Sequence, residues 1–317
     1  ENLFHCVIAA HITQVAKRIN YSELDILAPF LNSEKYKIYY ALVPHRSEDY
    51  SEEYEKGVQR HRERVCKLVE QYTPRDIDGL IQVCLESSRT FDKEERELST
   101  GLEYVFDALQ DQQQLYLYLA DAYMKADTPY KIYAGQILER LFEIKPVSEV
   151  KKFITQYRYN QQNVWLWCFY SFMPEQQVSA RWAAELLQYL GTPDVEMEAP
   201  PYRRIESLRK YESVEPGIIF KALRIVADHY EESPYVFNLY AYWVLNHSNQ
   251  QEADELLRTF SHELPLLEEI YLKGLSYSQH EDFNGTLLYA IISVDTLFLY
   301  RYIDCLIAAQ GDCFRVH

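Results

Sequence analysis

Glycine and proline are scarce in this sequence, with nine glycines and twelve prolines among 317 residues. Folds with many strands need these residues at their turns, so the composition disfavours a large sheet. Leucine, glutamate, glutamine and alanine, which favour helices, are frequent instead. The composition therefore predicts an all-α protein, and an apolar content of 48% is ample for a sizeable core.

Sequence motifs that hold nucleotides or build a nucleophile elbow are absent. The sequence has no G-x-x-x-x-G-K-[ST] loop, no G-x-G-x-x-G after a strand and no G-x-S-x-G turn. P-loop, dinucleotide-binding and α/β-hydrolase chemistry are thereby excluded from the printed sequence. We therefore expect a chain that needs no cofactor and is not itself an enzyme.

Metal-binding knuckles are also missing. Two loose groups of histidine and cysteine lie near the chain ends: His5, Cys6 and His11, and Cys305, Cys313 and His317. Structural zinc sites show paired C-x-x-C or H-x-x-x-H spacings, which neither group has. His262-Glu263 begins a zinc-protease pattern, but Leu266 stands where its second histidine would be. We expect no metal site.

No hydrophobic run is long enough to cross a bilayer. The run LFHCVIAAHI (residues 3–12) is too short, and the longer LLYAIISVDTLFLY (residues 287–300) is interrupted by Asp295. The six cysteines are far apart and follow no secretory signal, which is typical of reduced thiols in a cytosol. We expect a cytoplasmic chain without a membrane segment.

Positive charge is in short supply. The chain has 32 Lys and Arg against 48 Asp and Glu, a formal net charge of −16. Nucleic-acid binding depends on cations that displace counterions from phosphates, so this balance disfavours it. Arg60, Arg64 and Lys67 share one helical face and keep nucleic acid open as an alternative.

Aromatic residues are abundant, and one stretch concentrates them: SPYVFNLYAYWVLNHSNQQEADELL (residues 233–257). Its first apolar stripe consists of Val236, Leu239, Tyr240, Trp243 and Val244. This is the i, i+3, i+4, i+7, i+8 spacing of a helix with one buried face. Residues 246–249 interrupt the pattern before a second stripe starts at Ala253, so the stretch predicts a helical hairpin. We expect most of these rings to be core packing.

The same construction recurs along the chain. Paired helices are predicted at residues 94–110 with 111–127, 130–145 with 146–158, 163–173 with 178–191, 217–230 before the quoted stretch, and 264–278, 284–295 and 296–310. A single hairpin cannot bury its apolar face alone, so stacked neighbours are the stable solution. The pattern predicts an irregular α-solenoid of stacked hairpins, similar to tetratricopeptide or HEAT arrays. LADAYMKA (residues 119–126) resembles part of a tetratricopeptide consensus.

Two polar stretches predict the boundaries between parts of the chain. PHRSEDYSEE (residues 44–53) ends a first helical segment, and TPDVEMEAPPY (residues 192–202) contains a Pro-Pro pair that cannot continue a helix. We therefore expect three parts, with the Pro-rich stretch as an elbow. They are residues 1–50, residues 51–192 and residues 203–317.

Partner contacts are expected on rings off the buried stripe and on the basic residues after the elbow. The candidates are Tyr235, Tyr242, Arg203, Arg204, Arg209 and Lys210. Tyrosine combines an apolar ring with a polar tip, which suits protein interfaces. The cations suit a phosphate or an acidic protein surface, although Glu206 can pair with Lys210 one helical turn away.

An all-helical enzyme is a second hypothesis. His229 with Glu232, and His280 with Asp282, are the kind of pairs that general acid–base catalysis uses. The hypothesis requires these pairs to converge in the fold. Asp76 and Asp78 also offer close carboxylates, but a helix start is expected there, where acids satisfy free N–H groups.

Two stretches of the chain resemble the helical repeats that follow the NTPase module in bacterial STAND or NACHT-type proteins. They are KYESVEPGIIFKALRIVADHYEESPYVFNLYAYWVLN (residues 210–246) and YSQHEDFNGTLLYAIISVDTLFLYRYIDCLI (residues 277–307). The resemblance covers about residues 75–317 and rests on the general pattern of the helical repeats, because such repeats have no invariant signature. It implies a sensor that binds a foreign or partner protein and releases the NTPase to oligomerise, often in defence against phage.

The chain begins at Glu1 rather than at methionine and has no Walker motif, so we expect it to be a C-terminal piece of such a protein. The function predicted from the sequence is a non-catalytic protein-binding helical-repeat module, the ligand-sensing part of a larger signalling or antiphage NTPase. Its expected partner is a protein ligand, and self-association through the full-length protein stays open.

Overall fold

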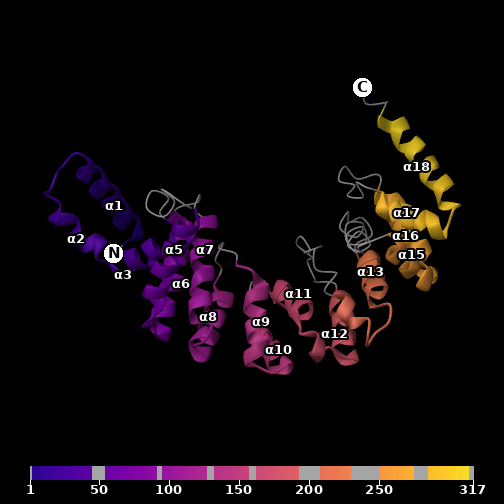
Figure 1. Cartoon of the computed structure of the whole chain (residues 1–317), viewed down its shortest axis with the longest axis horizontal. Coiled ribbons are helices and arrows are strands. Elements are labelled where there is room, and N and C mark those ends of the chain that lie inside the picture. The colour runs from indigo at the N-terminus through magenta and orange to yellow at the C-terminus, as the bar shows by residue number, and fades with distance from the viewer. Residues whose placement is uncertain are drawn as a thin grey trace. The chain divides into compact units, whose positions relative to one another are not determined.

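The computed structural model describes residues 2–44, 54–90, 95–126, 132–156, 162–192, 208–229, 250–274 and 285–313. Over these ranges every regular element is a helix and none is a strand (Figure 1). The all-α prediction is therefore confirmed. Within the described ranges, no helix is both long enough and apolar enough to cross a membrane.

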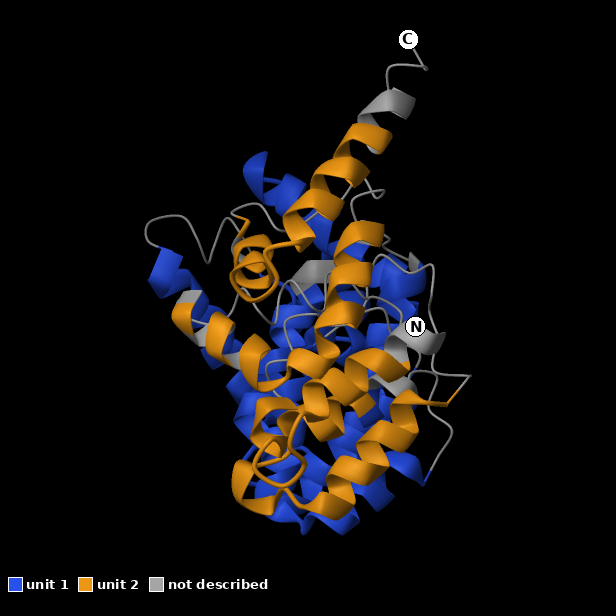
Figure 2. Ribbon diagram, turned by 90° about the vertical axis from the view of Figure 1, so that its right-hand side faces the viewer, with its two compact units in different colours: residues 1–166 blue, residues 167–317 orange. Residues whose placement is uncertain are grey.

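The chain forms two compact units, residues 1–166 and residues 167–317 (Figure 2). The division falls within the helix Gln162–Phe172, whereas the sequence predicts an elbow at residues 192–202. Residues 193–207 lie outside the described part, so the elbow stays a prediction. Each unit has buried apolar side chains of its own.

Unit 1 (residues 1–166) consists of short and medium helices with few residues between them. Its elements are α1 (Leu3–Arg18), η1 (Asp25–Leu27), α2 (Ala28–Leu31), α3 (Glu34–Leu42), α5 (Tyr54–Val69), α6 (Pro74–Thr90), α7 (Glu95–Leu109), α8 (Gln113–Lys125), α9 (Ala134–Ile144), α10 (Val147–Thr155) and the first turn of α11 (Gln162–Phe172). Helix α5 packs on α7, and α6 packs on α8. Successive hairpins of unit 1 therefore lie alongside one another, as their apolar stripes require.

Unit 2 (residues 167–317) repeats this arrangement in its described parts. Its elements are the rest of α11, η2 (Glu175–Gln177), α12 (Ala180–Leu190), α13 (Ile218–His229), α15 (Gln250–Thr259), η4 (Ser261–Glu263), α16 (Leu264–Gly274), α17 (Thr286–Val294) and α18 (Phe298–Cys313). Helix α15 packs on α17, and α16 packs on α18. The helix that the sequence predicts before residue 246 lies outside the described residues.

Local signals place the helix ends close to where the sequence predicts them. The pair expected at 94–110 and 111–127 becomes α7 and α8, with bounds that differ by at most a few residues. Pro74 is the first residue of α6, a position that proline favours because its missing N–H has no helical partner there. The side chain of Ser179 accepts the Trp182 N–H and caps α12.

Aromatic rings fill the core of each unit. In unit 1, the Phe106 ring meets Tyr116 and Tyr123 edge to face, with centroids 5.6 and 5.7 Å apart. In unit 2, Tyr211 is fully buried and its hydroxyl donates to the Tyr170 carbonyl at 2.9 Å. Burial of such rings stabilises the fold, and the tyrosine hydroxyls remain hydrogen-bonded. These tyrosines pack the core, as the sequence predicts for most of its rings.

Candidate binding surfaces

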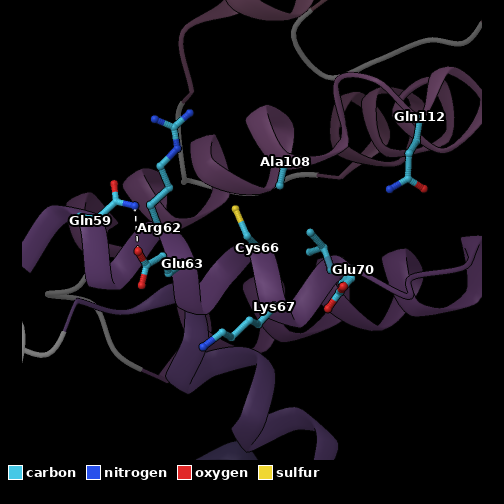
Figure 3. A pocket seen from close by; sticks show the side chains of 9 residues that line it. Gln59, Arg62, Glu63, Cys66, Lys67, Glu70, Ala108 and Gln112 are labelled. Atoms are coloured by element: carbon cyan, nitrogen blue, oxygen red, sulfur yellow. Dashed lines mark hydrogen bonds between the residues drawn. The ribbon is translucent and has the colours of Figure 1, made fainter.

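A groove of about 760 Å³ runs beside α5 in unit 1 (Figure 3). We call it the α5 groove; it is lined by Gln59, Arg62, Glu63, Cys66, Lys67, Val69, Glu70, Ala108 and Gln112. Most of these residues belong to α5, while Ala108 comes from α7 and Gln112 precedes α8. Helices α5 and α7 and the residue before α8 therefore build one surface that is rich in polar side chains.

The position of α5 is fixed by the end of α3. His61 is buried, and its Nε2 lies 2.9 Å from the Leu42 carbonyl oxygen. Arg64 donates to the neighbouring Val43 carbonyl at 3.2 Å. The last carbonyls of a helix have no partner within that helix, so these contacts satisfy the end of α3 and hold α5 against it.

Helix α7 is fixed against the same carbonyl by a glycine. A Cβ on Gly101 would lie 2.1 Å from the Leu42 oxygen, closer than any real contact, so only glycine allows the two backbones to approach this far. The sequence gives no hint of this role, because Gly101 stands in an ordinary amphipathic helix. Helices α5 and α7 are therefore both packed against the end of α3, through His61 and Gly101 respectively.

Asp107 joins three helices at one end of the α5 groove. Its carboxylate accepts from Arg62 of α5 at 3.2 Å and from Gln136 of α9 at 2.6 Å. The guanidinium of Arg62 also lies 6.0 Å from the ring centroid of Tyr104, within the range of a cation–π contact. Arg62 is therefore a cation held in a fixed place.

The middle of the α5 groove carries side chains that are not engaged in this way. Cys66 points across the groove towards Ala108, Glu70 lies further along, and Lys67 extends away from Ala108 (Figure 3). The side chains of Lys67 and Glu70 make no hydrogen bond or ion pair with any other described residue. Gln59 donates to Glu63 at 2.9 Å. This part of the groove offers a thiol and charges of both signs to a ligand.

A second exposed surface lies on α1. Its inner side is buried, but a stripe on the opposite side is apolar and exposed: Phe4, Ile8, Ile12, Val15 and Ile19, which we call the α1 outer face. The side chains of Val15 and Ile19 are 57% and 70% exposed. In the sequence, residues 3–12 stand out only as a run too short to cross a membrane. The signal missed there is that α1 is apolar on two sides, a pattern typical of a helix covered on both.

Helix α18 carries a comparable stripe in unit 2. Phe298 is fully buried, whereas Leu299, Tyr300, Ile303 and Ile307 are exposed and form the α18 outer face. These residues recur at helical spacing, so they share one side of α18. Ile307 is 65% exposed.

Buried charge holds α18 to its neighbours. Arg301 donates to Glu268 of α16 at 2.6 Å and to Asp295 at 3.1 Å. Burial raises the pKa of Glu268, although Arg301 acts against this. Asp295, which interrupts the apolar run of residues 287–300, also accepts the Leu297 N–H at 2.9 Å. The cluster holds α18 against α16 and explains why an aspartate stands at position 295 within an apolar run.

Lys210, a predicted partner contact, is engaged within unit 2. Its Nζ donates to the carbonyls of Ser171 and Met173 at 2.8 and 2.5 Å, at the end of α11. Burial lowers its pKa from 10.5 to about 8. Arg209 beside it is half-buried. The predicted pairing of Glu206 with Lys210 involves a residue outside the described part.

The other predicted contacts, Arg203, Arg204, Tyr235 and Tyr242, lie outside the described residues. The same holds for Glu232, His280 and Asp282 of the enzyme hypothesis, while His229 ends α13. The convergence that this hypothesis needs therefore stays a prediction.

Asp76 and Asp78 have structural partners. Asp76 accepts the Thr73 hydroxyl and N–H at 2.6 and 2.8 Å, and these bonds hold its pKa below the ordinary value. Asp78 accepts the Tyr118 hydroxyl at 3.0 Å. Over the described ranges, no three His, Cys, Asp or Glu residues gather as metal ligands would.

No family model, no curated protein and no solved structure matches this chain. The α5 groove and the two outer faces are therefore the basis on which its function can be inferred.

Proposed function

We propose that this chain is a non-catalytic protein-binding module, with the α5 groove as a contact surface. The composition of the groove carries the proposal: apart from Val69 and Ala108, every lining residue is charged, an amide or a thiol. Sites for small molecules are mostly apolar and enclose their ligand. A polar surface along a helix suits a protein ligand better, because side-chain amides such as those of Gln59 and Gln112 can bond to its backbone.

The charges of the groove indicate the kind of partner. Arg62 is held by Asp107, so its cation is presented in one place. Lys67 and Glu70 have no described partner and can turn towards a ligand. Complementary charges across an interface act mainly on specificity and on the rate of association. We therefore expect a protein ligand that carries charges of both signs.

The resemblance of residues 210–246 and 277–307 to STAND-type helical repeats supports a finer proposal, in which this module is the ligand sensor of a bacterial STAND-type NTPase. The complete reading frame tests it. A Walker A motif encoded upstream of Glu1 would support the sensor role, whereas a native chain that starts near residue 1 would contradict it.

The contact surface is tested by a charge exchange, Lys67→Glu with Glu70→Lys, which leaves the net charge unchanged. Intact proteins are screened for binding to the immobilised chain, and each partner found is titrated against both forms. We expect the exchange to weaken binding at least tenfold. Lys152→Glu, on an exposed part of α10 away from the groove, is the matched control and should bind as the wild type does.

Two results would contradict this proposal. One is a partner that binds the charge-exchanged chain as tightly as the wild type. The other is a screen without partners, together with turnover of a small substrate by the isolated chain. The second result would favour the enzyme hypothesis, and His229→Ala with His280→Ala would then test its residues. Binding of nucleic acid that weakens as the salt concentration rises would favour the nucleic-acid alternative.

A further inference from the structure

One cation serves two carboxylates where α18 meets α16. The Nη2 atom of Arg301 donates to the Oε2 atom of Glu268 at 2.6 Å and to the Oδ2 atom of Asp295 at 3.1 Å. The side chain of Glu268 is 5% exposed, and that of Asp295 is 30% exposed. With both carboxyls ionised, the cluster carries one negative charge more than Arg301 can balance.

Arg301 does not satisfy the whole of the Glu268 carboxylate. The Oε1 atom of Glu268 is buried and has no hydrogen-bond partner among the described residues. A buried anion that lacks partners is unfavourable, and two carboxylates at one site repel each other. Uptake of a single proton removes the excess charge, and a neutral carboxyl can donate a hydrogen bond to the other carboxylate. The charge count of the cluster therefore favours one shared proton.

Among the described residues, Arg301 is the one cation bonded to this carboxyl pair. The other acidic and basic residues described on η4, α16 and α18 form no hydrogen bond or ion pair with Glu268 or Asp295. They are His262, Glu263, Glu269, Lys273 and Asp304. Glu263 is bound instead to Arg224 of α13, and Glu269 is bound to Lys273. Helix α17 contains no acidic or basic residue.

The pKa values of the two carboxyls move apart. Burial, together with Asp295, raises the pKa of Glu268 above its ordinary value of 4.5, and Arg301 acts against this. The Leu297 N–H, Glu268 and Arg301 hold the pKa of Asp295 below its ordinary value of 3.8. The proton therefore resides on Glu268 while Asp295 remains ionised, as is usual when two carboxyls share a site.

We propose that Glu268 and Asp295 share one proton, and that this proton makes the junction of α16 and α18 a pH-sensitive latch. In mildly acidic solution the cluster is neutral, and α18 is held more tightly than in neutral solution. Opening of the latch separates the rings of Tyr271 and Phe298, which are buried against each other across the junction with centroids 5.9 Å apart. The latch lies in unit 2 and does not depend on the α5 groove, so the two proposals can fail separately.

The direction of the pH effect follows from proton linkage. Because the closed junction binds the Glu268 proton more tightly than the open one, closing becomes more favourable as pH falls from neutral towards 4.5. Below pH 3.8 the sign reverses, since protonation of Asp295 then removes the bonds that its anion accepts. One proton changes the opening equilibrium by at most about tenfold per pH unit.

Hydrogen exchange of the α18 amides measures this opening equilibrium. Protection of α18 is compared between neutral pH and about pH 5, after correction for the chemical exchange rate at each pH. Helix α11 is the internal reference, because it contains no charged residue. We expect the protection of α18 relative to α11 to rise at least about threefold as pH falls over this range.

Two neighbouring glutamates of α16 provide a variant and its matched control. Glu268→Gln imitates the protonated carboxyl, so it should protect α18 at neutral pH as strongly as the wild type is protected in mild acid, without a further rise. Glu269→Gln makes the same change on the exposed side of α16 and should retain the wild-type response.

A second variant covers the case in which Glu268→Gln does not fold. Asp295→Asn keeps an oxygen for the Leu297 N–H but removes the second carboxylate, so Arg301 then balances Glu268 and the rise in mild acid should disappear.

Four results would overturn the proposal. They are equal relative protection of wild-type α18 at both pH values, a full response in Glu268→Gln, a full response in Asp295→Asn, and a lost response in Glu269→Gln. The first would show that no proton is taken up when α18 closes. Each of the others would place that proton outside the pair of Glu268 and Asp295.

Discussion

In unit 1, α3, α5 and α7 meet through hydrogen bonds to the carbonyls of Leu42 and Val43 and through the bare backbone of Gly101. In unit 2, α16 and α18 meet through the ion cluster of Glu268, Arg301 and Asp295. The first junction depends on close approach, and the second depends on charge. Junctions of similar topology can therefore respond to different perturbations, namely added volume in unit 1 and altered ionisation in unit 2.

The largest expected effect tests the close approach in unit 1. Gly101→Ala would place a methyl group against the Leu42 carbonyl oxygen, and both backbones would have to move apart. We expect a loss of about 3 kcal/mol in the free energy of unfolding, measured with denaturant. Gly79→Ala is the matched control, because a Cβ there meets open space. It should stabilise α6 by about 0.5–1 kcal/mol. Equal effects of the two changes would contradict the close contact.

The second prediction tests the charge of unit 2. Arg301→Met removes the partner of Glu268, whose side chain is 5% exposed, and leaves its carboxylate buried without a counter-charge. We expect the free energy of unfolding to fall by about 2 kcal/mol at neutral pH. This is less than for fully buried pairs, because half of the Arg301 side chain is exposed.

The pH dependence distinguishes this charge effect from lost packing. Without Arg301 the pKa of Glu268 rises further, so the loss should shrink as pH falls and the carboxyl becomes neutral. Arg258→Met, on an exposed position of α15, is the control and should be nearly neutral. A loss that does not depend on pH would show that packing, rather than charge, holds α18.

The smallest effect concerns alkaline pH. Burial lowers the pKa of Lys210 from 10.5 to about 8. Between these two pH values Lys210 is protonated in the unfolded chain and neutral in the folded chain. The free energy of unfolding should therefore rise with pH across this range. Buried tyrosines act in the opposite sense: burial raises the pKa of Tyr123 from 10.0 to about 12, so stability is lost as pH rises through this range. Denaturant titrations across alkaline pH should show both trends. Lys210→Met should abolish the rise and retain the fall, and a rise that persists in this variant would contradict the assignment.

The helices themselves could be predicted from the sequence, because they depend on local periodicity. The pairs expected at 130–145 with 146–158 and at 163–173 with 178–191 appear as α9 to α12 with small differences at their ends. Signals such as Pro74 and Ser179 act within one turn, so neighbours in the sequence are enough to read them. The predicted solenoid depends on how the units continue one another and stays a prediction.

The candidate sites could not be predicted in the same way. The sequence presents Lys210 as a cation open to a partner, yet its side chain ends on carbonyls of Ser171 and Met173, about forty residues earlier in the chain. The α5 groove combines residues of α5 with Ala108 and Gln112, whose proximity no local pattern reveals. The outer faces of α1 and α18 are visible in the sequence only as apolar residues, without any sign of which side is covered.

The sequence by itself determined that this chain is helical and where most of its described helices begin and end, because turn formation and amphipathic spacing are properties of neighbouring residues. Only the tertiary structure decided which apolar stripes are buried, which charges are already paired and where a groove opens. Burial depends on residues that are distant in the chain. The backbone contact at Gly101 and the buried carboxylate of Glu268 both arise in this way, since each acquires its role only when another helix packs against it.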